Sequence, residues 1–214
     1  MNLSKLQQSL FILHKCASTV NRVWSAMEQN REKGPIYSMF HYSHNLAYYV
    51  IMETVAFLDE YNKYFVPAHV EPEFRQRVTE VRKVVKPILR EIFLWSDLIT
   101  YRNKVIAHGW REEKRGNELT LPHATTYKVP RSAFEFQLLK DYVLYVEAII
   151  TMEFETEIGE AILLGYHGTS IKRADIDYTN INTKLQSMLD EMNATADSLG
   201  KNYDLKIHGY RFND

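Results

Sequence analysis

The sequence predicts an all-α protein, a helical bundle of four long helices plus a shorter C-terminal helix. Apolar residues recur with the 3.6-residue helical period over long stretches of the chain. Helix-breaking residues are scarce, with eight glycines and six prolines among 214 residues. At 45% hydrophobic and 25% charged residues, the chain carries enough apolar side chains to bury one substantial core.

The first three helices follow from this period and from the breakers between them. The first spans about residues 3–31 and ends before a Gly-Pro pair. The second spans about residues 37–65 and is dense in Tyr, Phe, Leu and Val. After the turn "EPEF", the third spans about residues 72–108. We expect Pro87 to kink it, because proline removes a backbone donor and clashes with the preceding turn.

The second half of the chain is predicted in the same way. Gly109 ends the third helix, in the position that glycine favours. Alternation in "ELTL" and "TYKV" predicts a small β-hairpin-like insertion near residues 117–129. A fourth long helix follows at about residues 131–164, and a last helix at about residues 177–199.

We expect one helical domain over residues 1–214, with its core at about 1–165 and a C-terminal helical appendage at about 174–214. The single cysteine, Cys16, excludes an internal disulfide and, with no signal peptide, indicates a reducing, cytoplasmic setting. No segment approaches the ~18 apolar residues of a membrane helix. We therefore expect no membrane span.

The net charge of −1 hides an asymmetry along the chain. Residues 72–115 hold 11 Lys or Arg against 6 Asp or Glu, a net +5. Residues 131–165 hold 2 against 7, a net −5. A local basic region can bind phosphate although the whole chain would not. Alternatively, the basic and acidic helices complement each other inside the fold.

One charge interrupts the apolar face of the predicted third helix. At 100° per residue, apolar side chains fall within about 80° of Arg102 on one side and about 100° on the other. They are Ile88, Ile92, Trp95, Ile99 and Ile106, and Leu94, Leu98, Tyr101 and Val105. His108 and Asn103 lie at the two edges of this arc, roughly 120° and 100° from Arg102. Arg102 is therefore expected near the middle of a wide apolar surface.

Burying an unpaired guanidinium costs several kcal/mol, so Arg102 needs an acidic partner or a polar cleft. A partner would have to come from another helix, and Asp59 and Glu53 are the candidates. Alternatively, the Arg102 side chain extends past the apolar rim into water. These structural roles stand beside a functional one.

His108 supplies the functional alternative. It lies in the last turn of the predicted helix, where the negative end of the helix dipole favours the protonated imidazole. Such a histidine can give as well as accept a proton near neutral pH. An arginine beside it suits phosphodiester chemistry, since it adds a cation for the phosphate oxygens.

The run RNKVIAHG, from Arg102 to Gly109, resembles the R-N-x4-H motif of the HEPN superfamily. Members of that family are compact helical bundles of toxin–antitoxin, abortive-infection and CRISPR-associated systems, and many are metal-independent endoribonucleases. The resemblance is sharp over about residues 100–109 and covers the helical architecture over about residues 1–165.

The resemblance implies an active site shared across a homodimer, with two motif copies lining one cleft and no cofactor. His108 would handle the proton of the ribose 2′-hydroxyl or of the leaving oxygen. Arg102 would stabilise the pentacovalent phosphorane, and Asn103 would orient the site. A broad apolar arc around Arg102 would then serve as the dimer interface.

Three further residues, Tyr101, Lys104 and Arg111, are the candidates for substrate binding, and Tyr101 can stack on a base. The partners implied are an RNA substrate, a second copy of the chain, and an antitoxin or nucleotidyltransferase-type protein. Two other function classes stay open. Some HEPN proteins with an intact motif bind RNA, a nucleotide or a protein without cutting. The third class is a plain helical scaffold with an ion pair at Arg102.

Two other groups of residues carry weaker signals. His41 and His44 share one face of the second helix, but no further ligand with zinc-site spacing is evident, so no metal is predicted. Either histidine, or Asn45, can instead face the motif cleft. Four glutamates in and just before "FETEIGE" are predicted to form a solvated surface: Glu153, Glu155, Glu157 and Glu160.

Overall fold

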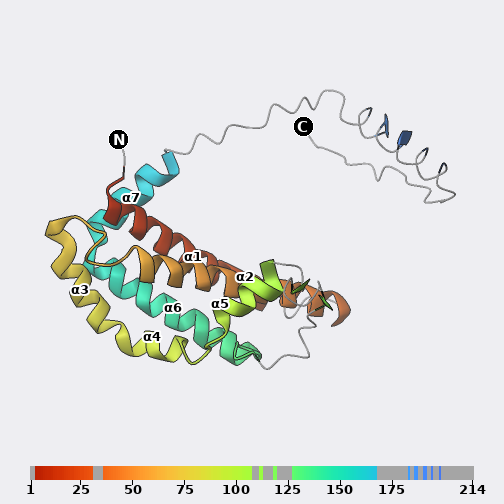
Figure 1. Cartoon of the computed structure of the whole chain (residues 1–214), viewed down its shortest axis with the longest axis horizontal. Coiled ribbons are helices and arrows are strands. Elements are labelled where there is room, and N and C mark those ends of the chain that lie inside the picture. Colours follow the sequence, from red (N-terminus) through yellow and green to blue (C-terminus); the bar gives the residue numbers. More distant parts are fainter. Residues whose placement is uncertain are drawn as a thin grey trace. The chain divides into compact units, whose positions relative to one another are not determined.

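The computed structural model describes residues 3–30, 36–107, 111–112, 118–119 and 127–167, and single helical positions between 183 and 198. The chain forms two compact units, Met1–Thr169 and Ser170–Asp214. The first unit is mostly helical, as predicted, and its described residues include seven α-helices (Figure 1). None of the helices described has the length and apolar content that a membrane span needs.

Helix α1 (Lys5–Asn30) matches the predicted first helix to within two residues at its start. Ser4 and Gln7 form a capping box, in which each side chain accepts from the other residue's backbone N–H. The next two backbone donors, of Lys5 and Leu6, are taken by the Glu71 carboxylate at 2.8 and 3.2 Å. Burial alone would raise the pKa of Glu71, but these donors outweigh it and lower that pKa.

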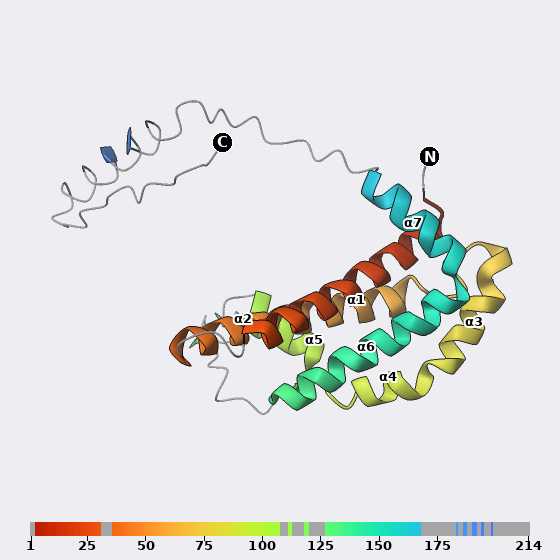
Figure 2. The ribbon, with the colours of Figure 1, turned by 180° about the vertical axis from the view of Figure 1, so that it is seen from behind.

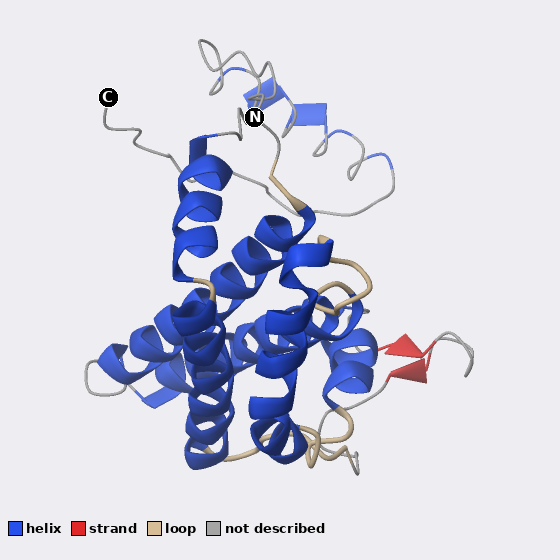
Figure 3. Ribbon diagram, turned by 90° about the vertical axis from the view of Figure 1, so that its left-hand side faces the viewer, coloured by secondary structure: helices blue, strands red, loops and turns tan. Residues whose placement is uncertain are grey.

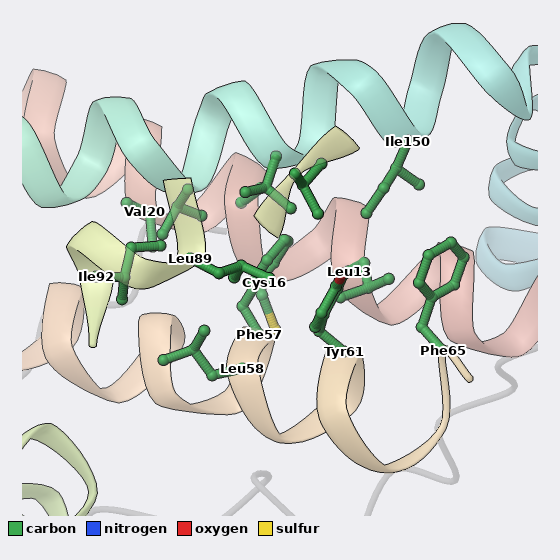
Figure 4. Packing of buried hydrophobic residues seen from close by; sticks show 14 of the residues in the cluster. Leu13, Cys16, Val20, Phe57, Leu58, Tyr61, Phe65, Leu89, Ile92 and Ile150 are labelled. Carbon is green, nitrogen blue, oxygen red and sulfur yellow. The ribbon is translucent and has the colours of Figure 1, made fainter. Parts of the chain in front are cut away.

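Helix α2 (Ile36–Lys63) packs along α1, and α6 (Ala133–Glu153) packs against both. The three helices lie side by side in opposite views (Figures 1 and 2). Their shared core is built from residues at helical spacing, as the close view in Figure 4 shows. The fully buried contacts on α1 are Leu6, Leu10, Leu13, Ala17 and Val20, and those on α2 include Phe57, Leu58 and Tyr61.

The predicted continuous third helix at 72–108 is wrong, because the chain breaks it twice. A short 3-10 turn leads into α3 (Arg75–Val84), and α4 (Lys86–Ile92) begins anew with Pro87 in its first turn. Proline removes one donor of the ladder, and the expected interruption lies at Val85, which still donates to the Val81 carbonyl at 3.0 Å and accepts from the Leu89 N–H at 3.1 Å. The second break, at residues 93–97, precedes the single turn α5 (Leu98–Tyr101).

The second break coincides with a pair of hydrogen bonds between Asp97 and Lys128, which is 31 residues later in the sequence. Asp97 donates its backbone N–H to the Lys128 carbonyl at 3.2 Å. The Asp97 carboxylate accepts from the Lys128 N–H at 2.7 Å. This pairing uses the Asp97 backbone N–H, which in a continuous helix would donate to the carbonyl four residues earlier. From Arg102 the chain winds more widely, as the π-helical turn η2 (Arg102–Ala107).

The predicted fourth helix at 131–164 is also divided. Helix α6 begins at a capping box formed by Ser132 and Glu135 and ends at Phe154, where α7 (Glu155–His167) starts. Phe154 is fully buried, and its ring lies edge-on to Phe65 at 5.9 Å. Burial of this ring fixes the joint between the two helices.

Two short strands lie beside the helices (Figure 3). β1 (Arg111–Glu112) pairs antiparallel with β2 (Glu118–Leu119). Thus "ELTL" contributes a strand, but its partner is residues 111–112 and not "TYKV". The backbone of Lys128 bonds Asp97 instead, which uses the groups that a strand at "TYKV" would need. Residues 113–117 and 120–126 lie outside the described part of the chain.

In the second unit the described positions are helical, at 183, 186, 187, 190, 191, 194 and 198. Gln186 donates to the Asp190 carboxylate at 2.7 Å, four residues along one helical face. The predicted helix at 177–199 and the domain boundary stay predictions.

Candidate functional site

Arg102 lies where α5 passes into the π-helical turn η2. The helical wheel placed Arg102 in one apolar arc that ran through residues 88–106. Because the helix is interrupted at residues 93–97, the side chains of α4 and those of α5 do not continue one common face. Of the predicted arc, Ile92 is fully buried, whereas Leu94 is 68% and Ile99 44% exposed. Arg102 therefore lies at the edge of the core, on a segment that presents apolar side chains to solvent.

Among the residues that the structure describes, the Arg102 guanidinium has one acidic neighbour. Its Nη2 lies 3.5 Å from Asp59 Oδ2, and both side chains are 28% exposed. Lys63 shares this carboxylate, since its Nζ lies 3.1 Å from Asp59 Oδ1. A strong arginine–carboxylate pair is bidentate with contacts of about 2.7–2.9 Å. The Arg102–Asp59 contact is longer and single, so the predicted partner is present but holds the arginine loosely.

Arg102 Nε is buried and has no hydrogen-bond acceptor among the residues that the structure describes. A buried donor without an acceptor costs about 1–3 kcal/mol. The guanidinium thus combines a loose ion pair, an unused buried donor and partial exposure. Because Nε is buried, only the part of the Arg102 side chain that remains exposed could meet a further anion or polar group.

Tyr101 is part of the core. It is 8% exposed, its ring lies edge-on to Tyr127 at 5.5 Å, and it is tilted against Tyr48 at 6.3 Å. Burial, followed by the Tyr48 hydroxyl, raises the pKa of Tyr101 well above its usual range. This packing occupies the ring, so Tyr101 positions the motif and the predicted base-stacking role is not supported.

The structure places the remaining predicted site residues only in part. Asn103 is exposed and Lys104 is half-buried, both directly after Arg102 on η2. Arg111 begins β1, but its side chain lies outside the described residues. His108 itself lies outside them. The pairing of Arg102 with His108 therefore stays a prediction.

His41, His44 and Asn45 belong to α2, but their side chains are not among those that the structure describes. Within the described residues, no group of three or more His, Cys, Asp and Glu side chains could hold a metal ion.

The other predicted partner of Arg102, Glu53, lies beside Cys16. Burial, and then the charge of Glu53, raises the pKa of the Cys16 thiol to about 12. A thiol that stays protonated is a poor nucleophile. Cys16 is therefore a core residue.

Part of the basic region at 72–115 is used within the fold. Arg77 donates to the Glu153 and Glu157 carboxylates, each at 2.7 Å, and to the Glu153 carbonyl. Arg82 donates to the carbonyls of Tyr61 and Phe65 at 2.6 and 2.9 Å, where α2 ends. Among the described side chains of this region, the exposed cations are Arg75, Lys83, Lys86 and Arg90.

Glu155 and Glu160 are exposed, as predicted, but the Arg77 contacts correct the prediction of a solvated surface for Glu153 and Glu157. Glu153 and Glu157 are four residues apart and meet on one cation, and Glu160 accepts from Gln7 at 2.8 Å. The basic and acidic regions thus complement each other at this joint, as one of the two alternatives predicted. Their pairing was missed because it crosses 76 positions of sequence.

No protein-family model, no curated protein and no solved structure matches this chain.

Proposed function

We propose that the chain is a metal-independent endoribonuclease whose active site forms across a homodimer. One observation carries the proposal: Arg102 has an unused buried donor and a single loose ion pair, on a π-helical turn. Single π-helical turns occur frequently at functional sites. An arginine placed only for stability would be expected to satisfy its donors. Because Nε itself is buried, the phosphate is proposed to bind the part of the guanidinium that remains exposed.

In the proposed reaction the ribose 2′-hydroxyl attacks the adjacent phosphorus, an O2′–P bond forms, and the P–O5′ bond breaks. His108 of one protomer accepts the 2′-hydroxyl proton, and His108 of the other supplies a proton to the leaving 5′-oxygen. Arg102 stabilises the negative charge that gathers on the phosphorane oxygens. Asn103, exposed beside it, orients the scissile group. Lys104 and Arg111 bind flanking phosphates.

The second copy is proposed to dock on the segment before Arg102. Phe93, Leu94 and Ile99 are 48%, 68% and 44% exposed, and together they form an apolar surface beside the motif. A homodimer that buries this surface would bring two motifs together. The finer architecture is proposed to be a four-helix bundle of α1, α2, the α3–α5 segment and α6, with a β-hairpin-like insertion.

The setting and partners follow from the same proposal. A single buried thiol suits a reducing cytoplasm. A bacterial defence or toxin–antitoxin role is proposed from the motif. An antitoxin or a nucleotidyltransferase-type protein would then be the natural regulator.

A second candidate is favoured by the Arg102–Asp59 contact. In it, the chain is a non-catalytic helical module that binds RNA, a nucleotide or a protein, or a plain scaffold, and Arg102 supports the packing of η2 on α2. The two candidates differ in what the loss of His108 would do.

The decisive experiment incubates the purified full chain with end-labelled RNA in the presence of EDTA. We expect cleavage that leaves 2′,3′-cyclic phosphate ends, because the 2′-hydroxyl is the nucleophile. His108→Ala should reduce the rate by about 10²–10⁴, the usual contribution of a general acid–base group. Its melting temperature should match that of the control Arg90→Ala, which removes an exposed arginine of α4. Full activity of His108→Ala, or activity restored only by added metal, would overturn the proposal.

The dimer is tested separately by sedimentation at micromolar concentration. We expect a dimer for the unaltered chain and a monomer of lower activity for Leu94→Glu, because a charge would have to be buried in the interface. The matched control is Met152→Glu, which changes a 79% exposed apolar residue on α6. An unaltered chain that sediments as a monomer would contradict the shared active site.

A further inference from the structure

A pocket of about 570 Å³ lies between the first turns of α1 and the end of α2. Helix α1 contributes Lys5, Ser9 and Ile12, and Glu60 comes from the last turns of α2. None of the candidate residues of the Arg102 motif lines it. We call this cavity the α1–α2 pocket. Its volume falls in the range of about 300–1,000 Å³ that is typical of small-molecule sites.

The floor of the α1–α2 pocket is polar and buried. Glu60 is 9% and Ser9 1% exposed, in a layer that is otherwise apolar core. Among the described residues, no cation lies within ion-pair distance of the Glu60 carboxylate. Ser9 Oγ lies close enough to act on this carboxylate but makes no hydrogen bond of normal geometry. Burying such groups without partners is costly, so the floor is built to receive donors.

The wall of the pocket is aromatic. Tyr64 is 55% exposed, and its ring lies 6.1 Å from the exposed His69 ring with a tilt of 38°. The His69 N–H bonds the Val66 carbonyl at 2.9 Å, which closes a tight turn and fixes the wall. Glu71 ties the end of this loop to the first turn of α1. The wall is therefore preformed, and a flat ring can stack on it.

Lys5, an exposed cation, lines the pocket together with the buried carboxylate of Glu60. A ligand that satisfies both groups needs N–H donors at one end and an anionic group at the other. A cavity of 570 Å³ would hold on the order of twenty waters at about 30 Å³ each, which approaches the size of a mononucleotide and exceeds that of an amino acid.

We infer that the α1–α2 pocket binds a guanine nucleotide, with the base on Glu60 and the phosphate on Lys5. Guanine offers two adjacent N–H donors on one edge, from N1 and from the 2-amino group, and these match the two oxygens of a carboxylate. Adenine and cytosine place a ring acceptor beside their amino group, and uracil flanks its N–H with two carbonyls. The base ring stacks on Tyr64.

The test is a calorimetric titration of the full chain with GMP, IMP and ribose 5-phosphate as probes. We expect GMP to bind with a Kd below about 1 mM. IMP lacks the 2-amino donor, so it should bind about fivefold to a hundredfold more weakly, and ribose 5-phosphate should show no binding in this range. Absence of GMP binding, equal binding of GMP and IMP, or equal binding of ribose 5-phosphate would each overturn the assignment.

Variants locate the binding in this pocket. Glu60→Gln should weaken GMP binding about tenfold or more, since an amide offers one acceptor where the carboxylate offers two. Tyr64→Leu should weaken it about fivefold to a hundredfold by removing the stacking surface. Tyr145→Leu, which changes a 58% exposed tyrosine of α6 outside the pocket, should leave the affinity unchanged.

The pocket and the proposed nuclease site can fail separately, because the titration does not measure RNA cleavage. GMP binding that is lost in Glu60→Gln and Tyr64→Leu supports the pocket even in a chain that cuts no RNA. GMP binding that survives both substitutions places the nucleotide elsewhere and overturns the inference.

Discussion

Arg77 and Arg102 are exposed to a similar degree, 35% and 28%, yet their surroundings differ sharply. Every nitrogen of the Arg77 guanidinium donates, to two carboxylates and one carbonyl, and the group lies 4.4 Å from the Phe154 ring. Arg102 has one contact of 3.5 Å and a buried Nε that donates to no described acceptor. Exposure to water therefore does not explain the difference.

The two arginines differ in how many of their guanidinium donors have a hydrogen-bond acceptor among the described residues. Arg77 closes the joint between α6 and α7, where the end of one helix and the start of the next must be held together. Arg102 leaves hydrogen-bonding capacity unused at a cost to stability. Residues that are kept at such a cost are expected at functional sites, where activity competes with stability. We therefore expect the two arginines to separate stability from activity.

The largest expected effect is on catalysis. Arg102→Ala should lower RNA cleavage by about 10²–10³, as removal of one group that stabilises a developing oxyanion commonly does. Arg77→Ala, assayed below its melting temperature, should keep most of the activity, because Arg77 lies at the α6–α7 joint. End-labelled RNA and matched concentrations of folded protein measure both rates. Equal losses in the two variants would remove the functional distinction between them.

The next effect is on stability. Arg77→Ala should lower the free energy of unfolding by about 2–3 kcal/mol, because it strands two carboxylates that remain partly hydrated. At about 2–4 °C per kcal/mol for a chain of this size, the melting temperature should fall by roughly 4–12 °C. Arg77→Lys should recover little, since a point charge cannot make the forked contacts. An unchanged melting temperature would show that the joint is held by the apolar packing of Phe154 alone.

The smallest effect on the free energy of unfolding is expected at the Arg102–Asp59 ion pair. Asp59→Asn should change the free energy of unfolding by no more than about 1 kcal/mol, the usual range for a partly exposed ion pair. Urea unfolding of this variant beside Glu157→Gln, which alters a carboxylate of the tight cluster, measures the difference. A loss at Asp59 as large as that at Glu157 would make Arg102 a structural residue and favour the scaffold.

The ends of the long helices could be predicted where the apolar period is unbroken and the contacts are local. Helices α1 and α2 match their predicted ranges within about two residues, because their buried faces keep one phase and breakers lie between them. The breaks at Asp97 and Phe154 could not be predicted in this way. Each depends on a contact with a distant segment, Lys128 in one case and Arg77 in the other.

Local signals for both breaks were present but weak. Ser96 and Asp97 are residue types that favour helix starts, and glutamates follow Phe154 where a new helix begins. At the candidate site, the sequence named Asp59 and Glu53 as the two candidate partners of Arg102, and Asp59 is the one in contact. The wheel placed Tyr101 in the apolar arc, and Tyr101 is buried, but the exposure of Leu94 and Ile99 was not predictable from it, because the wheel assumed one continuous helix through residues 88–106.

The Glu71 carboxylate that caps α1 has a consequence for how the chain folds during synthesis. The first turn of α1 is completed by a residue 66 positions later, and the same helix also packs against α7. At about 5–20 residues per second, the ribosome needs on the order of ten seconds after finishing α1 to deliver residue 167. Until α6 and then α7 have been synthesised, part of the apolar face of α1 has only α2 to cover it. We expect the nascent chain to depend on the early α1–α2 hairpin, and its aggregation during translation to rise when that hairpin is weakened.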